Sequence, residues 1–152
     1  MKIDLQKIYG YFWNARNSMS NIKAYLDMKT GEIFCPHNCE EYHRYKCLFE
    51  DCIFLDKKTG ETIDISNTDR YTPLFKIDPK EIQRDFIKEN KLEEDFEDFK
   101  QRVSESFTCF LEEYGGYDAV DVYGDYFDNR INEVAIPWCK KNNIEYFDSD
   151  AK

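Results

Sequence analysis

The chain has 152 residues, 41% of them hydrophobic and 16% aromatic, with a formal net charge of −10. That length and composition are typical of a single globular domain whose core forms without disulfides. No stretch is apolar for long enough to cross a membrane, and the acidic excess disfavours direct binding of nucleic acid.

The first predicted element is an amphipathic helix over residues 3–19. Apolar side chains recur along it at helical spacing: Leu5, Ile8, Tyr9, Phe12 and Trp13. Residues 1–7 contain no apolar run typical of a signal peptide. We therefore expect a cytoplasmic protein whose cysteines are reduced.

A short internal repeat follows. Residues 26–33 (LDMKTGEI) recur twenty-nine positions later as residues 55–62 (LDKKTGET). In each copy an Asp opens a turn and a Gly supplies a positive φ angle between two β-rich arms, which is typical of a β-hairpin with a bulged turn. We expect Gly31 and Gly60 to be structural, and we expect the two hairpins to pair in one antiparallel sheet of about four strands.

The segment that links the two hairpins, residues 35–52, contains four cysteines and both histidines of the chain. Thiolates and imidazoles are the ligands of structural zinc, and a helix over residues 40–46 would present such ligands four positions apart. We predict one structural zinc bound by Cys39, Cys47, Cys52 and either Cys35 or His43. The alternative is that Cys35 and Cys52 fill the core of the sheet without a metal.

The second half of the chain is predicted to be helical. Asp78 is a good N-cap and Pro79 suits the first helical position, so a helix is expected over residues 79–88. A second helix is expected from about residue 93, with a stripe of phenylalanines on one face. It should end at Gly115-Gly116, where glycine permits a helix C-cap.

The last elements follow a loop rich in Tyr, Asp and Gly, residues 117–124. A third helix is expected from about Asp125, because acidic side chains favour a helix N-terminus. Pro137 should kink or break this helix. Residues 144–147 are predicted to form a final short strand.

The negative charge is concentrated in the helical half. Between residues 93 and 128, twelve acidic side chains face two basic ones. This excess favours a basic protein partner or mimicry of a nucleic-acid backbone, and solvated helix faces are the alternative interpretation. The predicted interaction surface consists of Glu93, Glu94, Asp95, Glu97, Asp98, Glu112, Glu113, Asp118, Asp121 and Asp125.

Several motifs stand in a defined order along the chain. They are Tyr25-Leu26-Asp27 with Thr30-Gly31-Glu32, Arg70-Tyr71, Glu81-Ile82 with Asp85-Phe86, Phe107 and Phe110, Tyr126-Phe127, Ala135-Ile136-Pro137-Trp138-Cys139, and Asn142-Asn143. In order and spacing they resemble an uncharacterised bacterial protein family known only by a UPF placeholder name. The chain departs from that family at Thr108-Cys109, where basic residues are usual, and its Cys/His segment and second hairpin resemble an elaboration. The resemblance implies a bacterial or phage-borne cytoplasmic protein and supplies no activity.

We therefore expect one α+β domain over residues 1–152. An N-terminal helix and an antiparallel sheet of two repeated hairpins occupy residues 1–77, and an acidic three-helix half, residues 78–152, covers the sheet. The predicted function is a non-enzymatic protein-interaction or regulatory protein, such as an acidic inhibitor that binds a basic protein. The alternative is a metal-dependent hydrolase or nucleotide-processing enzyme that uses the carboxylates between Asp118 and Asp128.

Overall fold

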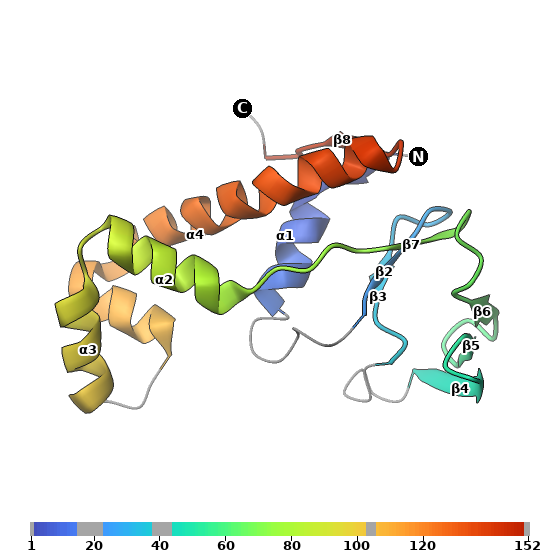
Figure 1. Cartoon of the computed structure of the whole chain (residues 1–152), viewed down its shortest axis with the longest axis horizontal. Coiled ribbons are helices and arrows are strands. Elements are labelled where there is room, and N and C mark those ends of the chain that lie inside the picture. Colours follow the sequence, from blue (N-terminus) through green and yellow to red (C-terminus); the bar gives the residue numbers. More distant parts are fainter. Residues whose placement is uncertain (1, 15–22, 38–43, 103–105, 151–152) are drawn as a thin grey trace. The chain divides into compact units, whose positions relative to one another are not determined.

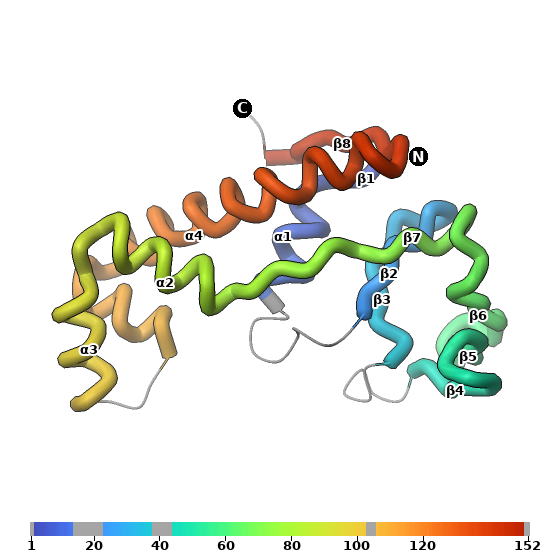
Figure 2. Tube along the Cα trace, in the orientation of Figure 1, coloured from blue at the N-terminus to red at the C-terminus, as the bar shows by residue number. Residues whose placement is uncertain are grey.

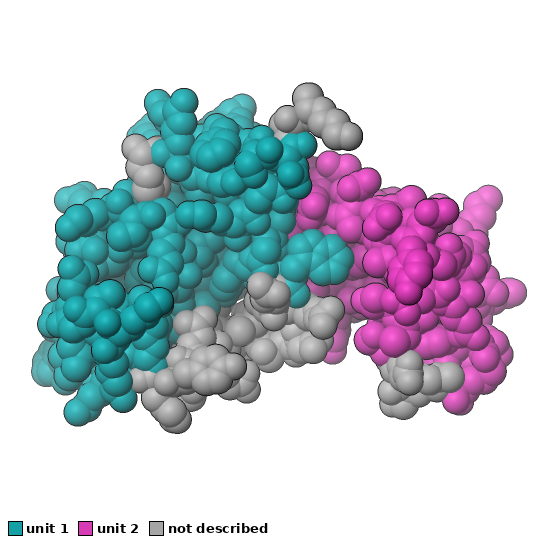
Figure 3. Space-filling model, turned by 180° about the vertical axis from the view of Figure 1, so that it is seen from behind, with its two compact units in different colours: residues 1–77, 135–152 teal, residues 78–134 magenta. Residues whose placement is uncertain are grey.

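The computed structural model describes residues 2–14, 23–37, 44–102 and 106–150 (Figure 1). The chain forms two compact units, coloured separately in Figure 3. Unit 1 comprises residues 1–77 and 135–152, and unit 2 comprises residues 78–134. Along the described residues, no helix is both long enough and apolar enough to cross a membrane.

Unit 1 begins with a strand rather than a helix. β1 (Lys2–Asp4) pairs in parallel with β8 (Glu145–Phe147), so the predicted final strand is confirmed (Figure 2). Helix α1 runs from Leu5 to Asn14. The Asp4 carboxylate accepts the backbone N–H of Gln6 at 3.1 Å, which caps the helix start. The predicted start at residue 3 is wrong, because the buried Ile3 belongs to the strand pair.

Unit 1 also contains two three-stranded antiparallel sheets. The first has the order β3-β2-β7, with β3 (Ile33–Phe34), β2 (Tyr25–Asp27) and β7 (Tyr71–Pro73). The second has the order β4-β5-β6, with β4 (Tyr45–Phe49), β5 (Ile53–Asp56) and β6 (Thr62–Asp64). The α+β class with two hairpins is confirmed. The expectation of one shared sheet is wrong, because each hairpin takes a third strand from elsewhere in the chain.

The two repeated turns have the same geometry. Gly31 and Gly60 both have a φ angle of 75°. Each donates its backbone N–H, at 2.7 Å, to the carbonyl of the Asp that opens its turn, Asp27 or Asp56. A residue with a Cβ is strained at this φ angle, so both glycines occupy the left-handed conformation that the repeat indicates.

The two sheets share one hydrophobic core. The ring of Phe34 in the first sheet lies 5.7 Å from that of Tyr45 in the second, measured between centroids. The core residues occupy matching positions in the two sheets: Tyr25 and Phe54, Phe34 and Ile63, Tyr71 and Tyr45. The core is therefore built from two copies of the same three positions.

Unit 2 begins with α2 (Pro79–Glu89), which confirms the predicted helix. The Asp78 carboxylate accepts the backbone N–H of Lys80 at 3.0 Å, and the helix buries Ile82, Phe86 and Ile87. α3 (Glu93–Arg102) and α4 (Phe107–Lys141) are two helices, so the single helix expected across residues 93–114 is wrong.

Helix α4 changes direction at one residue. Gly116 has non-helical φ and ψ angles of 66° and −156°, and the chain is helical on both sides of it. The expected loop over residues 117–124 is therefore wrong, because glycine turns the chain within a single residue. The helix also continues through Pro137 to Lys141, so no break occurs there.

Aromatic rings form much of the core of unit 2. The ring of Phe86 on α2 lies 5.0 Å from that of Tyr123 and 5.2 Å from that of Tyr126, both on α4. Phe107 at the start of α4 lies 4.8 Å from Tyr123. Edge-on contacts of this kind add to the free energy of burial. Burial raises the pKa of the Tyr123 hydroxyl, so it stays protonated.

Candidate interaction surfaces

Each repeated turn of unit 1 is bound by one arginine. Asp27 accepts two hydrogen bonds from Arg70, from Nε and Nη2, both at 3.2 Å. Asp56 accepts the same two bonds from Arg44, at 2.9 and 2.8 Å. Both aspartates are buried. This two-pronged geometry is the strongest arrangement of an arginine and a carboxylate, so each turn is tied firmly to its neighbouring strand.

Each arginine also reaches the glutamate of the other turn. Arg44 Nη1 lies 3.0 Å from Glu32 Oε1, and Arg70 Nη2 lies 3.8 Å from Glu61 Oε2. Arg44 thus binds the aspartate of the second turn and the glutamate of the first, and Arg70 does the reverse. These crossed ion pairs join the two sheets.

The ion pairs keep both aspartates charged. Hydrogen bonds from Arg44 lower the pKa of Asp56 to about 2, against an opposing effect of burial. Burial raises the pKa of Asp27, but hydrogen bonds from Arg70 and from the Lys29 backbone outweigh it, so this pKa also lies below its ordinary value. At neutral pH these groups are charged and paired. Their arrangement fits a structural role rather than proton transfer.

The repeat continues in the two segments that begin with these arginines. Residues 44–49 (RYKCLF) and 70–75 (RYTPLF) share Arg, Tyr, Leu and Phe. Tyr45 lies opposite Asp56, and Tyr71 lies opposite Asp27, so the two strands dock in the same register. The pairing is crossed. The arginine strand that follows the first hairpin docks on the second hairpin, and the strand that follows the second docks on the first.

The predicted zinc ligands are only partly described. Cys39 and His43 lie outside the described residues. Cys35 is buried, with its Sγ 3.0 Å from the hydroxyl of Tyr11. Cys47 and Cys52 are exposed, at either side of the turn between β4 and β5. Cys47 lies on a strand, so the expected helix that would present it together with His43 is wrong at this position.

Metal-binding geometry is not found in the described part of the chain. There, no group of three or more His, Cys, Asp or Glu side chains is placed to hold a metal ion. Structural zinc needs about four ligands, and two of the five candidate ligands lie outside the description. One zinc ion therefore stays a prediction.

The carboxylates named for the enzyme alternative form a row instead of a cluster. Asp118, Asp121, Asp125 and Asp128 follow one another along α4 at intervals of three and four residues. A helix rises 1.5 Å per residue, so these residues extend over about 15 Å. Carboxylates that bind one metal ion must converge on a single point. The row gives the enzyme alternative no support.

Unit 2 carries the whole net charge of the chain. It has 17 acidic and seven basic residues, whereas unit 1 has 14 of each. The predicted interaction surface lies entirely in unit 2, and each of its ten acidic residues is exposed. Helix α3 contributes Glu93, Glu94, Asp95, Glu97 and Asp98, and α4 contributes Glu112, Glu113, Asp118, Asp121 and Asp125.

Apolar side chains are exposed among these acids. Tyr114, Tyr117 and Val122 all lie largely in solvent, and Tyr117 is 81% exposed. A hollow of about 150 Å³ lies between α3 and the first turns of α4. It is lined by the rings of Phe99, Phe110 and Tyr114, the carboxylates of Asp95, Asp98 and Glu113, and the side chain of Arg102.

Basic side chains of unit 2 itself already bind to this surface. Arg102 Nε lies 3.1 Å from Asp98 and its Nη2 lies 3.3 Å from Glu113. Lys100 Nζ lies 2.7 Å from Glu97 and 4.9 Å from the ring centroid of Phe96. A carboxylate beside an aromatic ring is a suitable contact for a cation.

No protein family, curated protein or solved structure was found to match the chain. The resemblance to a UPF family stays a prediction.

The arginine half of the repeat was not predicted from the sequence. The spacing changes from 29 residues between Asp27 and Asp56 to 26 residues between Arg44 and Arg70. At an offset of 29 residues the two turns align with each other, but residues 44–49 and 70–75 do not. Allowing a three-residue gap would have aligned RYKCLF with RYTPLF.

Proposed function

We propose that the protein is a non-enzymatic interaction or regulatory protein whose acidic unit 2 binds a basic partner protein. The observation that supports this most strongly is the confinement of the net charge of −10 to one unit, on exposed side chains. A field of one sign attracts a partner of opposite sign and speeds association. It also repels nucleic acid, whose phosphates need basic contacts.

The exposed apolar groups suggest where binding energy would come from. Acidic side chains alone give steering and little affinity, because exposed ion pairs contribute little free energy. Tyrosines at the centre of an interface often contribute most of it. Tyr114 and Tyr117 lie within the acidic surface and would supply this contact.

The test measures binding of a fluorescent deca-arginine peptide by anisotropy. A variant with Glu93→Gln, Glu94→Gln, Asp118→Asn and Asp121→Asn removes four charges of unit 2, none of which forms an ion pair within 4 Å among the described residues. We expect the wild type to bind about tenfold more weakly at about 300 mM than at about 50 mM NaCl, because salt screens exposed charges. The variant should bind more weakly than the wild type at low salt.

A matched control removes four exposed charges of unit 1 instead. It carries Glu50→Gln, Asp69→Asn, Glu145→Gln and Asp150→Asn, so its net charge equals that of the first variant. Equal loss of affinity in both variants would mean that net charge alone attracts the peptide, and the assignment to unit 2 would fail. Affinity that does not change with salt would refute the electrostatic proposal itself.

An inhibitory role for unit 2 can be tested by competition with DNA. If unit 2 mimics a nucleic-acid backbone, it must compete with DNA for the same basic surface of a DNA-binding protein. Competition that disappears in the unit 2 variant and persists in the unit 1 control would support mimicry. If the partner binds DNA and the acidic protein at the same time, the protein is an interaction protein that does not mimic nucleic acid.

A further inference from the structure

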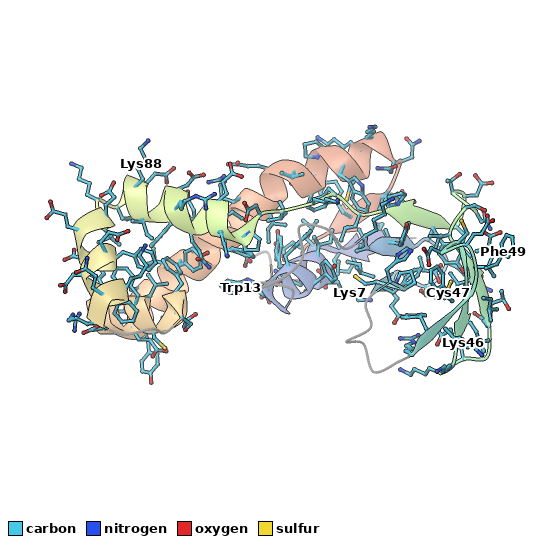
Figure 4. The ribbon with its side chains drawn as sticks, turned by 60° about the horizontal axis from the view of Figure 1, so that its bottom comes forward. Lys7, Trp13, Lys46, Cys47, Phe49 and Lys88 are labelled. Atoms are coloured by element: carbon cyan, nitrogen blue, oxygen red, sulfur yellow. The ribbon has the colours of Figure 1, made fainter. Side chains whose placement is uncertain are left out.

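The two arginine segments, residues 44–49 and 70–75, dock on their hairpins through the same contacts. The carbonyl of Arg70 accepts a backbone N–H from the first turn at 2.7 Å, and that of Arg44 accepts one from the second at 2.8 Å. Three residue pairs follow in the same register in each sheet: Asp27 with Tyr71, Leu26 with Thr72 and Tyr25 with Pro73, and Asp56 with Tyr45, Leu55 with Lys46 and Phe54 with Cys47. Lys46 and Cys47 of the second set are labelled on β4 in Figure 4. These contacts do not distinguish one arginine segment from the other.

The lengths of the connecting loops do not favour the observed partners either. Tyr71 lies 44 positions from Asp27, with which it pairs, and 15 positions from Asp56, with which it does not. The entropy of loop closure grows with the logarithm of loop length, so closure favours the second hairpin for this strand by about fivefold. Tyr45 lies 11 positions from Asp56 and 18 from Asp27, a preference of only about twofold for its observed partner. Crossed pairing therefore has no advantage in closure entropy.

Both connections are also long enough for the segments to exchange hairpins. Ten residues separate Phe34 from Tyr45, and six separate Asp64 from Tyr71. A segment that docks on the far side of the preceding hairpin must cross two strand spacings and return along one short strand, a path of about 14 Å. Even the six-residue connection extends to about 20 Å. An uncrossed arrangement is therefore sterically within reach of the chain.

Contacts outside the three residue pairs select the observed arrangement. The ring of Phe75 lies 5.2 Å from that of Phe12 on α1 and 5.5 Å from that of Trp138 on α4. Trp138 Nε1 also donates a hydrogen bond to the carbonyl of Pro73, at 3.1 Å. In the other arginine segment, Phe49 is 59% exposed. The contacts of Phe75 form after β7 has docked on the first hairpin, so they stabilise the final fold without directing the first encounter.

We propose that the chain has a second, uncrossed pairing, in which residues 44–47 dock on the first hairpin and residues 70–73 dock on the second. This isomer forms during refolding in competition with the crossed one. It converts slowly, because both arginines must leave their aspartates before the segments exchange. The isomer belongs to unit 1 and does not depend on the acidic surface of unit 2.

Two double variants that lose the same charges separate the two pairings. Asp27→Asn with Arg70→Gln leaves the crossed arrangement with one intact ion pair and one neutral pair, and leaves the uncrossed arrangement with an unpaired arginine and an unpaired aspartate. Asp27→Asn with Arg44→Gln has the opposite result. A largely buried charge without its partner is strongly destabilising, so each variant favours one pairing over the other.

Cross-strand NOEs in the NMR spectrum identify the pairing in each protein. The wild type and Asp27→Asn/Arg70→Gln should show contacts between Leu26 and Thr72. Asp27→Asn/Arg44→Gln should show a second set of signals, with contacts between Leu26 and Lys46. If this second variant unfolds, or retains only the contacts between Leu26 and Thr72, the uncrossed pairing does not hold the chain and the proposal is wrong.

Refolding from urea, followed by tryptophan fluorescence, tests whether the isomer forms in the wild type. A slow phase is expected, and its amplitude should be at least threefold smaller in Asp27→Asn/Arg70→Gln. The four prolines are the same in both proteins, so proline isomerisation contributes equally to their slow phases. Equal slow amplitudes in the two proteins, or a wild type that refolds without a slow phase, would overturn the competition between the two pairings.

Discussion

Unit 1 and unit 2 use charge in opposite ways. Unit 1 is balanced, and its central aspartates are buried and paired with arginines from neighbouring strands. Unit 2 has ten more acidic than basic residues, and those of its predicted surface are exposed. Buried paired charges specify which strands pair, whereas exposed charges contribute little to the stability of the fold and remain accessible to a partner. Single substitutions should therefore matter for folding in unit 1 and for binding in unit 2.

The largest expected effect is at the turn aspartates. Asp56→Ala leaves Arg44, whose side chain is only 22% exposed, without its main partner, so the free energy of unfolding should fall by about 3 kcal/mol. Asp27→Ala should have a similar effect, because its contacts are the same. Urea denaturation followed by tryptophan fluorescence measures this, since Trp13 and Trp138 both lie in unit 1.

The matched control for this prediction is in unit 2. Asp98→Ala removes the partner of Arg102 in an exposed ion pair and should change the free energy of unfolding by less than about 0.5 kcal/mol. Far-UV circular dichroism follows the helices of unit 2. Equal losses from the two substitutions would contradict the contrast between the units.

Acidification should remove the contribution of Asp56 to stability. Its folded pKa of about 2 lies below its ordinary value of 3.8. The stabilisation is therefore complete above about pH 4 and is lost as the pH falls towards about 2. Urea denaturation at a series of pH values should show that the difference in free energy of unfolding between the wild type and Asp56→Asn becomes smaller as the pH falls from about 4 to about 2. A difference that is constant down to pH 2 would mean that the carboxylate is not held by Arg44.

The repeated glycines should give a smaller effect. Gly60→Ala forces a Cβ into a φ angle of 75°, and should lower the free energy of unfolding by about 1–2 kcal/mol through backbone strain alone, because no heavy atom lies within 4 Å of the added Cβ. Gly10→Ala in α1 is the control. It also meets nothing within 4 Å, and should raise stability by about 0.5 kcal/mol because alanine favours a helix. Thermal melts of the two variants should move in opposite directions.

The smallest effect should come from salt. Raising NaCl from about 50 mM to about 500 mM screens the repulsion among the acids of unit 2 and should raise the melting temperature of its helices by about 2 °C. The tryptophan signal of unit 1 should change less, since that unit is balanced in charge. If the melting temperature of unit 1 rises more with salt than that of unit 2, the proposed contrast in charge between the units is wrong.

The sequence alone predicted the parts of the fold that depend on local chemistry. The two turns, the cap at Asp78 and the final strand all follow from residues close together in the chain. The crossed pairing could not be predicted in this way, because Asp27 and Arg70 are 43 positions apart. The residues near each hairpin do not indicate which of the two later strands will pair with it. The acidic surface was predicted because exposed charge is visible in composition, whereas the exposure of Phe49 depends on which helices lie nearby.

The crossed pairing also has a consequence for the order of folding. The second sheet closes a short loop, from Tyr45 to Asp56, whereas the first sheet closes one from Asp27 to Tyr71 that is about four times longer. The longer closure costs about 1 kcal/mol more in chain entropy. Once β4, β5 and β6 have formed, much of the loop between Asp27 and Tyr71 is already compact, and the ring of Tyr45 is in place to pack against Phe34. The second hairpin would then act as a scaffold on which the first hairpin pairs with β7, and refolding of β7 should lag behind that of β5.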